Sequence, residues 1–306
     1  MKPYSNRRTF IQTAIAGVAG MSLPGTLFSQ TAAVSADTLK LADDLYIVKV
    51  PGEANVLVQI DSKGALLVDG ASAKGSENLL KAVSLLPGAG TIHTLFNTHW
   101  HPEQTGSNER LGKAGATIIA HENTRLWLGQ NITWPWNGQK FAKLPKIAQP
   151  NKTFYTTGKL DSDIRYGYIA DAAHTDGDMY VYFPRQNVLA VGDAVSGQGW
   201  PVVDWWTGGW IGGIVGGIQR IQTVTNAETR IVPARGPVLT VADLRTQLDM
   251  YGKLYDTLSG MMNKGRGPTE AVAAQPAKEY ESKMGPSDEF IRRSFESLWA
   301  YTSPDA

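Results

Sequence analysis

Two histidines separated by one residue, directly after an apolar segment, constrain the fold of this chain more than any other feature. Residues 94–97 have the composition of a short strand, and His99 and His101 follow them. Alternate side chains of an extended chain point to the same side, so both imidazoles face the same way. Neutral imidazole is the commonest metal ligand in proteins. The sequence therefore predicts half of a metal site at the end of a strand.

Strand-like and helix-like segments alternate along much of the chain. Strand patterns are short apolar segments bounded by turn residues, whereas helix patterns repeat apolar residues every three or four positions. The first half predicts strands at 45–50, 55–60, 64–68, 94–97 and 117–120, with helices at 76–86, 108–115 and 122–128. The second half predicts helices at 211–221, 244–265 and 290–299. This alternation predicts helices packed on a sheet.

Residues 129–152 interrupt the alternation. They contain Trp134, Trp136 and several prolines without a clear period, so we predict a loop over the face that carries the histidines. The glycines among the apolar residues of 211–221 indicate close packing of that helix against a neighbouring element.

Four further motifs accompany residues 99–104. They are Asp69 after the run 65–68, His174 before the strand pattern 179–183, Asp193 after the run 188–192, and Arg235 in the turn 233–237. In this order and at these spacings, residues 41–240 resemble the metallo-β-lactamase fold family, whose first signature is His-x-His-x-Asp-His. The resemblance implies an α/β fold, a four-layer αββα sandwich, formed by one domain over residues 37–306.

The resemblance also implies a set of metal ligands. His99, His101 and His174 match the three histidines of the first metal site, which leaves a fourth tetrahedral position open, as in catalytic zinc sites. Asp193 matches the aspartate that two metals share in relatives with two ions. Asp69 matches a residue that supports the ligands from behind and orients an imidazole.

The second metal site departs from the family pattern. Its four positions are occupied by Glu103, Gln104, Asp193 and Arg235. A glutamine amide is a poor ligand, and an arginine carries a permanent positive charge. At 4 Å and an effective dielectric constant of about 20, two unit charges repel by about 4 kcal/mol. We therefore expect one zinc ion, with iron as the alternative, and an empty second site.

A single zinc ion bound by three histidines lowers the pKa of its water to about 7 and so provides hydroxide at neutral pH. Asp193 or Glu103 would orient this nucleophile and accept a proton. Arg235 would stabilise an oxyanion or bind a substrate carboxylate. The structural alternative is an Arg235–carboxylate pair that holds the turn closed.

Tryptophans indicate the type of substrate. Large aromatic walls suit an apolar or aromatic small molecule. The residues that we expect around the metal are Trp100, Trp134, Trp136, Trp200, Trp205 and Trp206, although some of them can equally belong to the core.

The first 36 residues indicate a removable export signal. Lys2, Arg7 and Arg8 form a basic start, and Arg-Arg-Thr-Phe-Ile resembles the twin-arginine signal. A moderately apolar, uncharged stretch follows, with a small-residue cleavage site at 34–36. Glycine and proline interrupt this stretch, which is too short for a spanning helix. We therefore expect a periplasmic or secreted protein.

Charge and composition limit the partners. Removal of the basic start changes the formal charge from +1 to −2, which argues against nucleic acid and against an anionic membrane surface as partners. The chain has no cysteine, so nitrogen and oxygen must hold any metal. We expect a small-molecule substrate and no membrane anchor after signal removal.

Three functions fit these residues. The first is a mononuclear zinc hydrolase of a small apolar ester, lactone or amide. The second is a mononuclear iron oxygenase similar to the persulfide dioxygenases of the same family, which use two histidines and an aspartate. The third is a non-catalytic binding scaffold with a degenerate site. The complete histidine set favours the hydrolase, and the altered second site argues against β-lactam hydrolysis as the main role.

Overall fold

The computed structural model describes residues 36–160, 163–169 and 172–302. The chain divides into two units, Met1–Ala33 and Val34–Ala306, and the described residues all belong to the second unit. The export signal predicted for residues 1–36 lies outside the described residues except for Ala36. Within the described ranges, no helix has the length and apolar character needed to cross a bilayer.

Two mixed β-sheets form the centre of this unit. The first sheet has the order β1 (Asp37–Ala42), β2 (Leu45–Lys49), β3 (Asn55–Asp61), β4 (Gly64–Val68), β5 (Ile92–Phe96), β6 (Thr117–His121) and β9 (Lys152–Phe154). The second has the order β10 (Thr157–Lys159), β11 (Arg165–Tyr168), β12 (Met179–Phe183), β13 (Val188–Gly192) and β14 (Arg230–Pro233). Strands β4, β5, β6 and β9 pair in parallel, as do β13 and β14.

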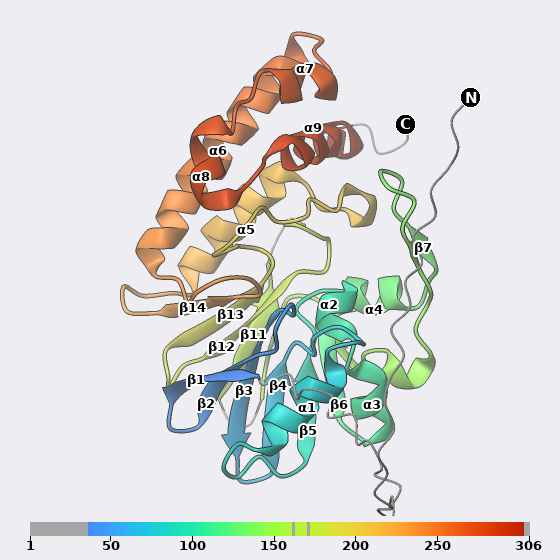
Figure 1. Cartoon of the computed structure of the whole chain (residues 1–306), viewed down its shortest axis with the longest axis vertical. Helices are drawn as coiled ribbons and strands as arrows, with labels where there is room; N and C mark the ends of the chain where they lie inside the picture. Colours follow the sequence, from blue (N-terminus) through green and yellow to red (C-terminus); the bar gives the residue numbers. More distant parts are fainter. Residues whose placement is uncertain (1–35, 161–162, 170–171, 303–306) are drawn as a thin grey trace, which may run out of the picture. The chain divides into compact units, whose positions relative to one another are not determined.

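Helices cover the outer face of each sheet (Figure 1). The first sheet packs against α1 (Ser76–Ser84) and α3 (Asn108–Lys113), and the second against α5 (Ile211–Thr223), α6 (Val241–Asn263) and α9 (Asp288–Thr302). The shorter helices are α2 (Pro102–Thr105), α4 (Glu122–Leu128), α7 (Pro268–Ala273) and α8 (Glu281–Met284). The predicted four-layer αββα arrangement is confirmed.

The strand sequences explain the layers. In β2, Leu45 and Ile47 face the core between the sheets, whereas Tyr46 and Val48 face the helices of the first layer. In β13, Val188 faces the other sheet and Leu189 faces the helices. Because strand side chains alternate between faces, a strand that is apolar throughout must be covered on both sides.

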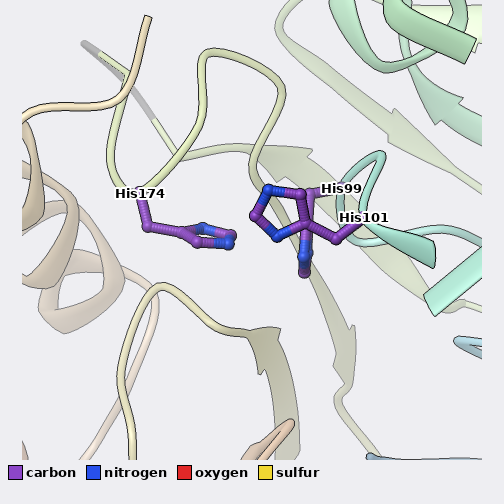
Figure 2. A group of neighbouring side chains, drawn as sticks. All are labelled: His99, His101 and His174. Atoms are coloured by element: carbon purple, nitrogen blue, oxygen red, sulfur yellow. The ribbon is translucent and has the colours of Figure 1, made fainter. Parts of the chain in front are cut away.

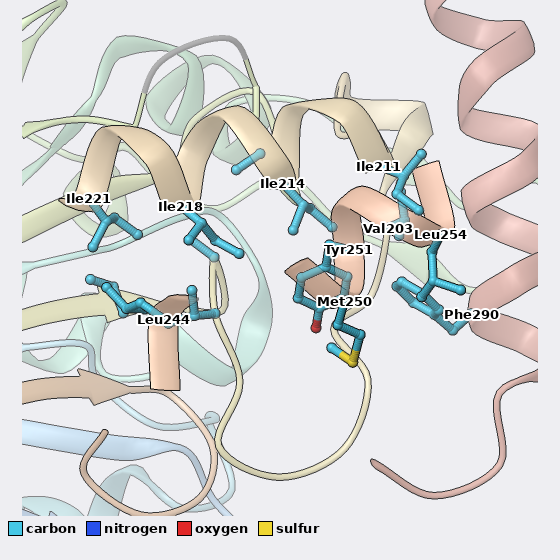
Figure 3. Close-up of a cluster of buried hydrophobic side chains, with 14 of the residues drawn as sticks. Val203, Ile211, Ile214, Ile218, Ile221, Leu244, Met250, Tyr251, Leu254 and Phe290 are labelled. Atoms are coloured by element: carbon cyan, nitrogen blue, oxygen red, sulfur yellow. The ribbon is translucent and has the colours of Figure 1, made fainter. Parts of the chain in front are cut away.

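Helix α5 packs closely on the loop that carries His174. Its isoleucines face α6 and α9 and belong to one buried apolar cluster. Figure 3 labels ten residues of this cluster: Val203, Ile211, Ile214, Ile218, Ile221, Leu244, Met250, Tyr251, Leu254 and Phe290. On another side of α5, a Cβ on Gly213 would collide with the carbonyl oxygen of Ala172. A Cβ on Gly217 would lie 3.0 Å from Cβ of Ala173. The glycines therefore allow the close packing that the sequence predicts.

Residues 129–152 are more ordered than the sequence predicts. They contain a small hairpin of β7 (Ile132–Thr133) and β8 (Lys140–Phe141), followed by the 3-10 helix η1 (Lys146–Ala148). The turn of the hairpin is closed by a hydrogen bond from Gly138 N to Trp134 O, and Gly138 has a positive φ of 70°. The sequence did not predict the hairpin, which is held by a small apolar cluster that includes Ile132, Trp134 and Trp100.

Candidate metal centre

Three histidines form the centre of the site. His99 and His101 follow β5, and His174 precedes β12, so both sheets contribute. The side chains are buried, and one ring nitrogen from each lies within 4.8 Å of the others. The ring centroids are 4.3 to 5.1 Å apart, with nearly perpendicular planes. Figure 2 shows the three rings converging from two sides.

Each imidazole has one nitrogen engaged by a neighbouring polar group. His99 Nδ1 lies 3.1 Å from Thr98 Oγ1, His101 Nε2 lies 3.0 Å from Asp204 Oδ2, and His174 Nδ1 lies 2.8 Å from Asp178 Oδ1. The other nitrogen of each ring is left for the shared centre.

The nitrogens that face the centre fit a metal ion. Nε2 of His99 and Nε2 of His174 are buried and make no hydrogen bond to the part of the chain that the structure describes. An unsatisfied buried polar atom costs about 1–3 kcal/mol. A cation bound by all three rings removes this cost, and a set of three neutral imidazoles is a common zinc site with one open position.

The carboxylate of Asp178 fixes the loop of His174. Besides its contact with the ring, it accepts hydrogen bonds from the backbone N–H groups of His174 (2.7 Å) and Thr175 (2.9 Å). Burial acts to lower the pKa of His174, but the charge and hydrogen bond of Asp178 outweigh it and raise the pKa. The pKa of His99 lies well below its usual value because of burial, so this ring is neutral.

Asp69 supports the centre through Thr98 rather than by direct contact with an imidazole. It lies at the end of β4 with a positive φ of 68°, and it accepts hydrogen bonds from Thr98 N (2.8 Å) and Thr98 Oγ1 (2.9 Å). Burial raises the pKa of Asp69 to about 8, although the hydrogen bonds from Thr98 act to lower it. A left-handed conformation in a residue with a side chain is strained, and such strain persists only where surrounding structure enforces it.

Asp193 connects the histidines to the residues that alter the second site. Its Oδ2 lies 3.7 Å from His99 Nε2 and accepts a hydrogen bond from Gln104 Nε2 at 3.2 Å. Its Oδ1 lies 3.6 Å from Arg235 Nε. The Asp193 side chain is 8% exposed and that of Arg235 is 45% exposed, so the guanidinium extends from the carboxylate toward solvent.

Glu103 lies beside this group without joining it. It belongs to α2, is half-buried, and lines the same cleft as His101 and Arg235. Among the described residues, Arg235 forms an ion pair with Asp193 and none with Glu103. The carboxylate that pairs with Arg235 is therefore that of Asp193.

The cleft above the histidines has a volume of about 850 Å³. Its lining includes His101, Glu103 and Asp193 of the candidate centre, together with Lys49, Trp134, Trp200 and Arg235. Asn55 holds the Arg235 turn in place, because its Nδ2 donates to the carbonyl oxygens of Pro233 and Gly236.

Two of the six predicted pocket tryptophans, Trp134 and Trp200, line the cleft. The other four lie outside this lining, and three of them serve as supports. Trp100 is buried against the His101 ring, Trp136 stacks on Trp134 at 4.9 Å, and Trp205 Nε1 donates to Glu296. Trp206 is 49% exposed. A tryptophan pattern alone does not distinguish a cleft wall from the layer behind it, so the substrate-pocket role of these four residues stays a prediction.

Three residues of the site were missed by sequence reasoning. Thr98 directly precedes His99 and Asp178 follows His174 by four residues, but nothing in the sequence alone assigns them to particular ring nitrogens. Asp204 lies outside every motif, 30 residues after His174 in the chain. Its only local signal is the pattern Asp-x-x-Thr, in which the carboxylate caps the 3-10 helix η2 (Trp205–Thr207).

The profile of the Metallo-beta-lactamase superfamily matches residues 50–249, a span that includes the three histidines, Asp193 and Arg235. The chain belongs to the metallo-beta-lactamase superfamily. The buried histidine group lies within the matched span and could hold a metal ion.

Solved structures of the superfamily share the fold. The crystal structure of DIM-1 metallo-beta-lactamase aligns with a TM-score of 0.57 and 18% identity, over 71% of this chain and 97% of that one. A metallo-beta-lactamase from Pontibacter korlensis aligns with a TM-score of 0.56 and 19% identity, over 71% and 99%.

A sequence relative is more limited in extent. A hydroxyacylglutathione hydrolase of Erythrobacter litoralis (strain HTCC2594) is 27% identical over 110 residues. The match covers 36% of this chain and 36% of that relative, so the chain spans little more than a third of the relative it matches.

Proposed function

We propose that the protein is a mononuclear zinc hydrolase that cleaves a small, largely apolar ester, lactone or amide. The observation that carries this proposal is the convergence of three buried histidines beside an aspartate that is already paired with Arg235. The three histidines support the binding of one metal ion, and the pairing of Asp193 with Arg235 argues against a second ion.

The contacts of Asp193 support a single ion. In a site with two ions this carboxylate would bind both, yet here one oxygen accepts from Gln104 and the other faces Arg235. A neutral amide donor and a fixed cation therefore occupy the side of Asp193 where a second ion would bind. Arginine cannot deprotonate in proteins and so cannot become a ligand.

His99 Nε2, His101 Nδ1 and His174 Nε2 would hold the ion, which when bound supplies a Lewis acid and a nucleophile from water at neutral pH. Asp193 and Glu103 are the carboxylates that can orient a water molecule in the cleft and accept its proton. Arg235 lines the same cleft, where its guanidinium can stabilise negative charge on the substrate.

The cleft walls support a substrate with an apolar body and an anionic group. Trp134 and Trp200 offer aromatic surface, whereas Lys49 and Arg235 offer positive charge. Within the described residues, Lys49 forms no ion pair. A small ester or lactone that carries a carboxylate would satisfy both kinds of wall.

Metal analysis and a substrate panel test the proposal. We expect about one zinc per chain and hydrolysis of aryl esters, lactones or amides that is lost with a chelator and restored by zinc. His101→Ala should abolish metal binding and hydrolysis, whereas His93→Ala should preserve both, because His93 is not part of the histidine group. Two equivalents of zinc per chain, or activity that chelators do not affect, would overturn it.

We also propose that the protein is exported, on the support of Arg7, Arg8 and the apolar stretch that follows them. Cell fractionation should place the full chain in the periplasm or medium, and Arg7→Lys combined with Arg8→Lys should retain it in the cytoplasm. Unchanged distribution of this double variant would contradict a twin-arginine route.

A further inference from the structure

Asp204 is a buried carboxylate outside the motifs that resemble the family. Its side chain has no solvent exposure and receives four hydrogen bonds. Oδ2 accepts from His101 Nε2 (3.0 Å), Trp134 Nε1 (3.2 Å) and Thr207 Oγ1 (2.7 Å), and Oδ1 accepts from Thr207 N (3.2 Å). An indole N–H and a backbone N–H can only donate, so the carboxylate acts here as an acceptor.

This arrangement determines which nitrogen of His101 carries the proton. Because Asp204 Oδ2 is an acceptor, His101 Nε2 must donate to it. A neutral imidazole has one proton, so Nδ1 then presents its lone pair. Nδ1 is the nitrogen left for the centre that His99 and His174 share.

We propose that Asp204 is a positioning residue that selects Nδ1 of His101 as the metal ligand. In this proposal Trp134, which lines the substrate cleft and donates a hydrogen bond to Asp204, makes the orientation of His101 depend on what occupies the cleft. The proposal rests on the metal site of the proposed function. It concerns Asp204 and Trp134, which act on the site through His101.

The connection runs through a continuous set of contacts. The Trp134 indole lines the cleft and packs against the His101 ring at 5.4 Å, while its N–H reaches Asp204. Behind it, Trp100 Nε1 donates to Thr207 Oγ1 at 3.0 Å, and that hydroxyl donates to Asp204. A substrate that moves Trp134 therefore moves a hydrogen-bond partner of the carboxylate that orients His101.

Asp204→Asn tests the selection of the nitrogen. An asparagine must place its NH₂ group against at least one of the donors that now surround the carboxylate. We expect the zinc affinity of the full chain, measured by competition with a chromophoric chelator, to fall about 10–100-fold, as for other partners of ligand histidines. In the zinc-free protein, ¹⁵N shifts should show His101 protonated at Nε2 and a shift toward Nδ1–H in the variant.

Asp176→Asn is the matched control. Asp176 also accepts a hydrogen bond from an indole, Trp127 Nε1 at 2.8 Å, but within the described residues its carboxylate makes no hydrogen bond or ion pair with an imidazole. We expect this variant to retain the zinc affinity of the unmodified protein. An equal loss in both variants would show a general effect of buried carboxylates and would overturn the proposal.

Trp134→Phe extends the test if Asp204→Asn does not fold. It keeps an aromatic wall and removes one donor to Asp204, while the donors from His101 and Thr207 remain. Zinc affinity should therefore fall less than in Asp204→Asn, by about 2–10-fold. Zinc affinity unchanged in this variant and in any folded Asp204 variant would refute the positioning role. Failure of the unmodified protein to bind zinc would instead refute the proposed function.

Discussion

At the scale of single residues, the site is organised by hydrogen-bond requirements. Each ligand histidine uses one nitrogen for a local partner, Thr98, Asp204 or Asp178, and so can offer only the other. Arg235 adds a fixed charge at the position where a second ion would need a ligand. A guanidinium bound through Nε retains its Nη donors, which makes it suited to bind a planar anion.

Arg235→Met should separate the two possible roles of this residue. If the Nη donors bind a substrate carboxylate, kcat/KM for an ester with a free carboxylate should fall about 10–100-fold, because hydrogen bonds to charged groups contribute about 1.5–3 kcal/mol. The corresponding methyl-blocked ester should be affected less. Arg185→Met, which removes an exposed arginine paired with Asp44, is the control. Equal losses for both esters would indicate a purely structural role.

At the scale of elements, helices place the site through close contacts. Helix α5 approaches the loop before His174 because glycine occupies the contact positions, and Gly209 similarly lies against the carbonyl group of His174. The strand ends provide the ligands, but helix packing determines where the His174 loop lies relative to His99.

Gly213→Ala and Gly216→Ala form a matched pair on α5. A Cβ at 213 would collide with the Ala172 carbonyl oxygen, whereas a Cβ at 216 meets nothing within 4 Å. We expect Gly213→Ala to destabilise the protein by about 1–3 kcal/mol and to weaken metal binding. Gly216→Ala should stabilise it by about 0.5–1 kcal/mol, as expected for alanine in a helix. Urea denaturation measures both values, and similar effects of the two changes would contradict this packing.

The start of α6 provides a stability prediction with a defined pH dependence. Thr240 caps the helix. The pKa of Asp243 is lowered, and the hydrogen bond from the backbone N–H of Thr240 is the largest cause. Thr240→Ala removes the hydroxyl, which also bonds to Asp243 Oδ2 at 2.7 Å and also lowers the pKa of Asp243. It should reduce the free energy of unfolding at pH 7 by about 1 kcal/mol. A carboxyl whose folded pKa is lowered stabilises the protein above its unfolded pKa of about 3.9 and loses this effect as the pH falls through the folded value.

Urea denaturation at pH 7 and pH 3 should therefore show a smaller effect of Thr240→Ala under acid conditions. Thr246→Ala, another exposed threonine of α6, is the control because its hydroxyl bonds only to the helix backbone. A loss that is equal at both pH values would exclude a contribution from Asp243.

At the scale of the whole molecule, the metal centre joins the two sheets. The first sheet provides His99 and His101, and the second provides His174, Asp193 and Arg235. Ligands that bind the folded state alone raise its stability in proportion to the logarithm of their concentration above Kd.

Zinc should therefore stabilise the protein against heat. At 100 times Kd the gain is about 2.7 kcal/mol, which corresponds to a rise in Tm of roughly 5–10 °C for a domain of this size. Differential scanning fluorimetry with and without zinc measures the shift, and His101→Ala should abolish it. A shift that persists in His101→Ala would mean that zinc binds elsewhere.

Sequence reasoning recovered the fold because the strands and motifs follow one another in a fixed order. The αββα layers follow from strands that are apolar on both faces, such as β2 and β13. It also indicated the three histidines that the structure brings together. It missed the hairpin at 132–141 and the role of Asp204, because the packing of the hairpin on Trp100 and the contact of Asp204 with His101 join segments far apart in the chain.

The tryptophans illustrate the same limit. Trp100 and Trp134 are both buried, yet Trp134 lines the cleft and Trp100 does not. Residue type predicts that a tryptophan will be removed from solvent. Only the packed structure shows whether it is buried in the protein core or lines a cleft that a ligand can fill.

The division of the ligands between the two sheets has a consequence for how the site is formed and lost. Neither half of the chain holds a complete set of imidazoles, so no fragment that contains only one sheet can bind the ion with full affinity. Separation of the sheets, even by a small amount, would disassemble the centre while each half kept its own strands. Metal release should therefore report the first opening of the interface between the halves, before either half unfolds.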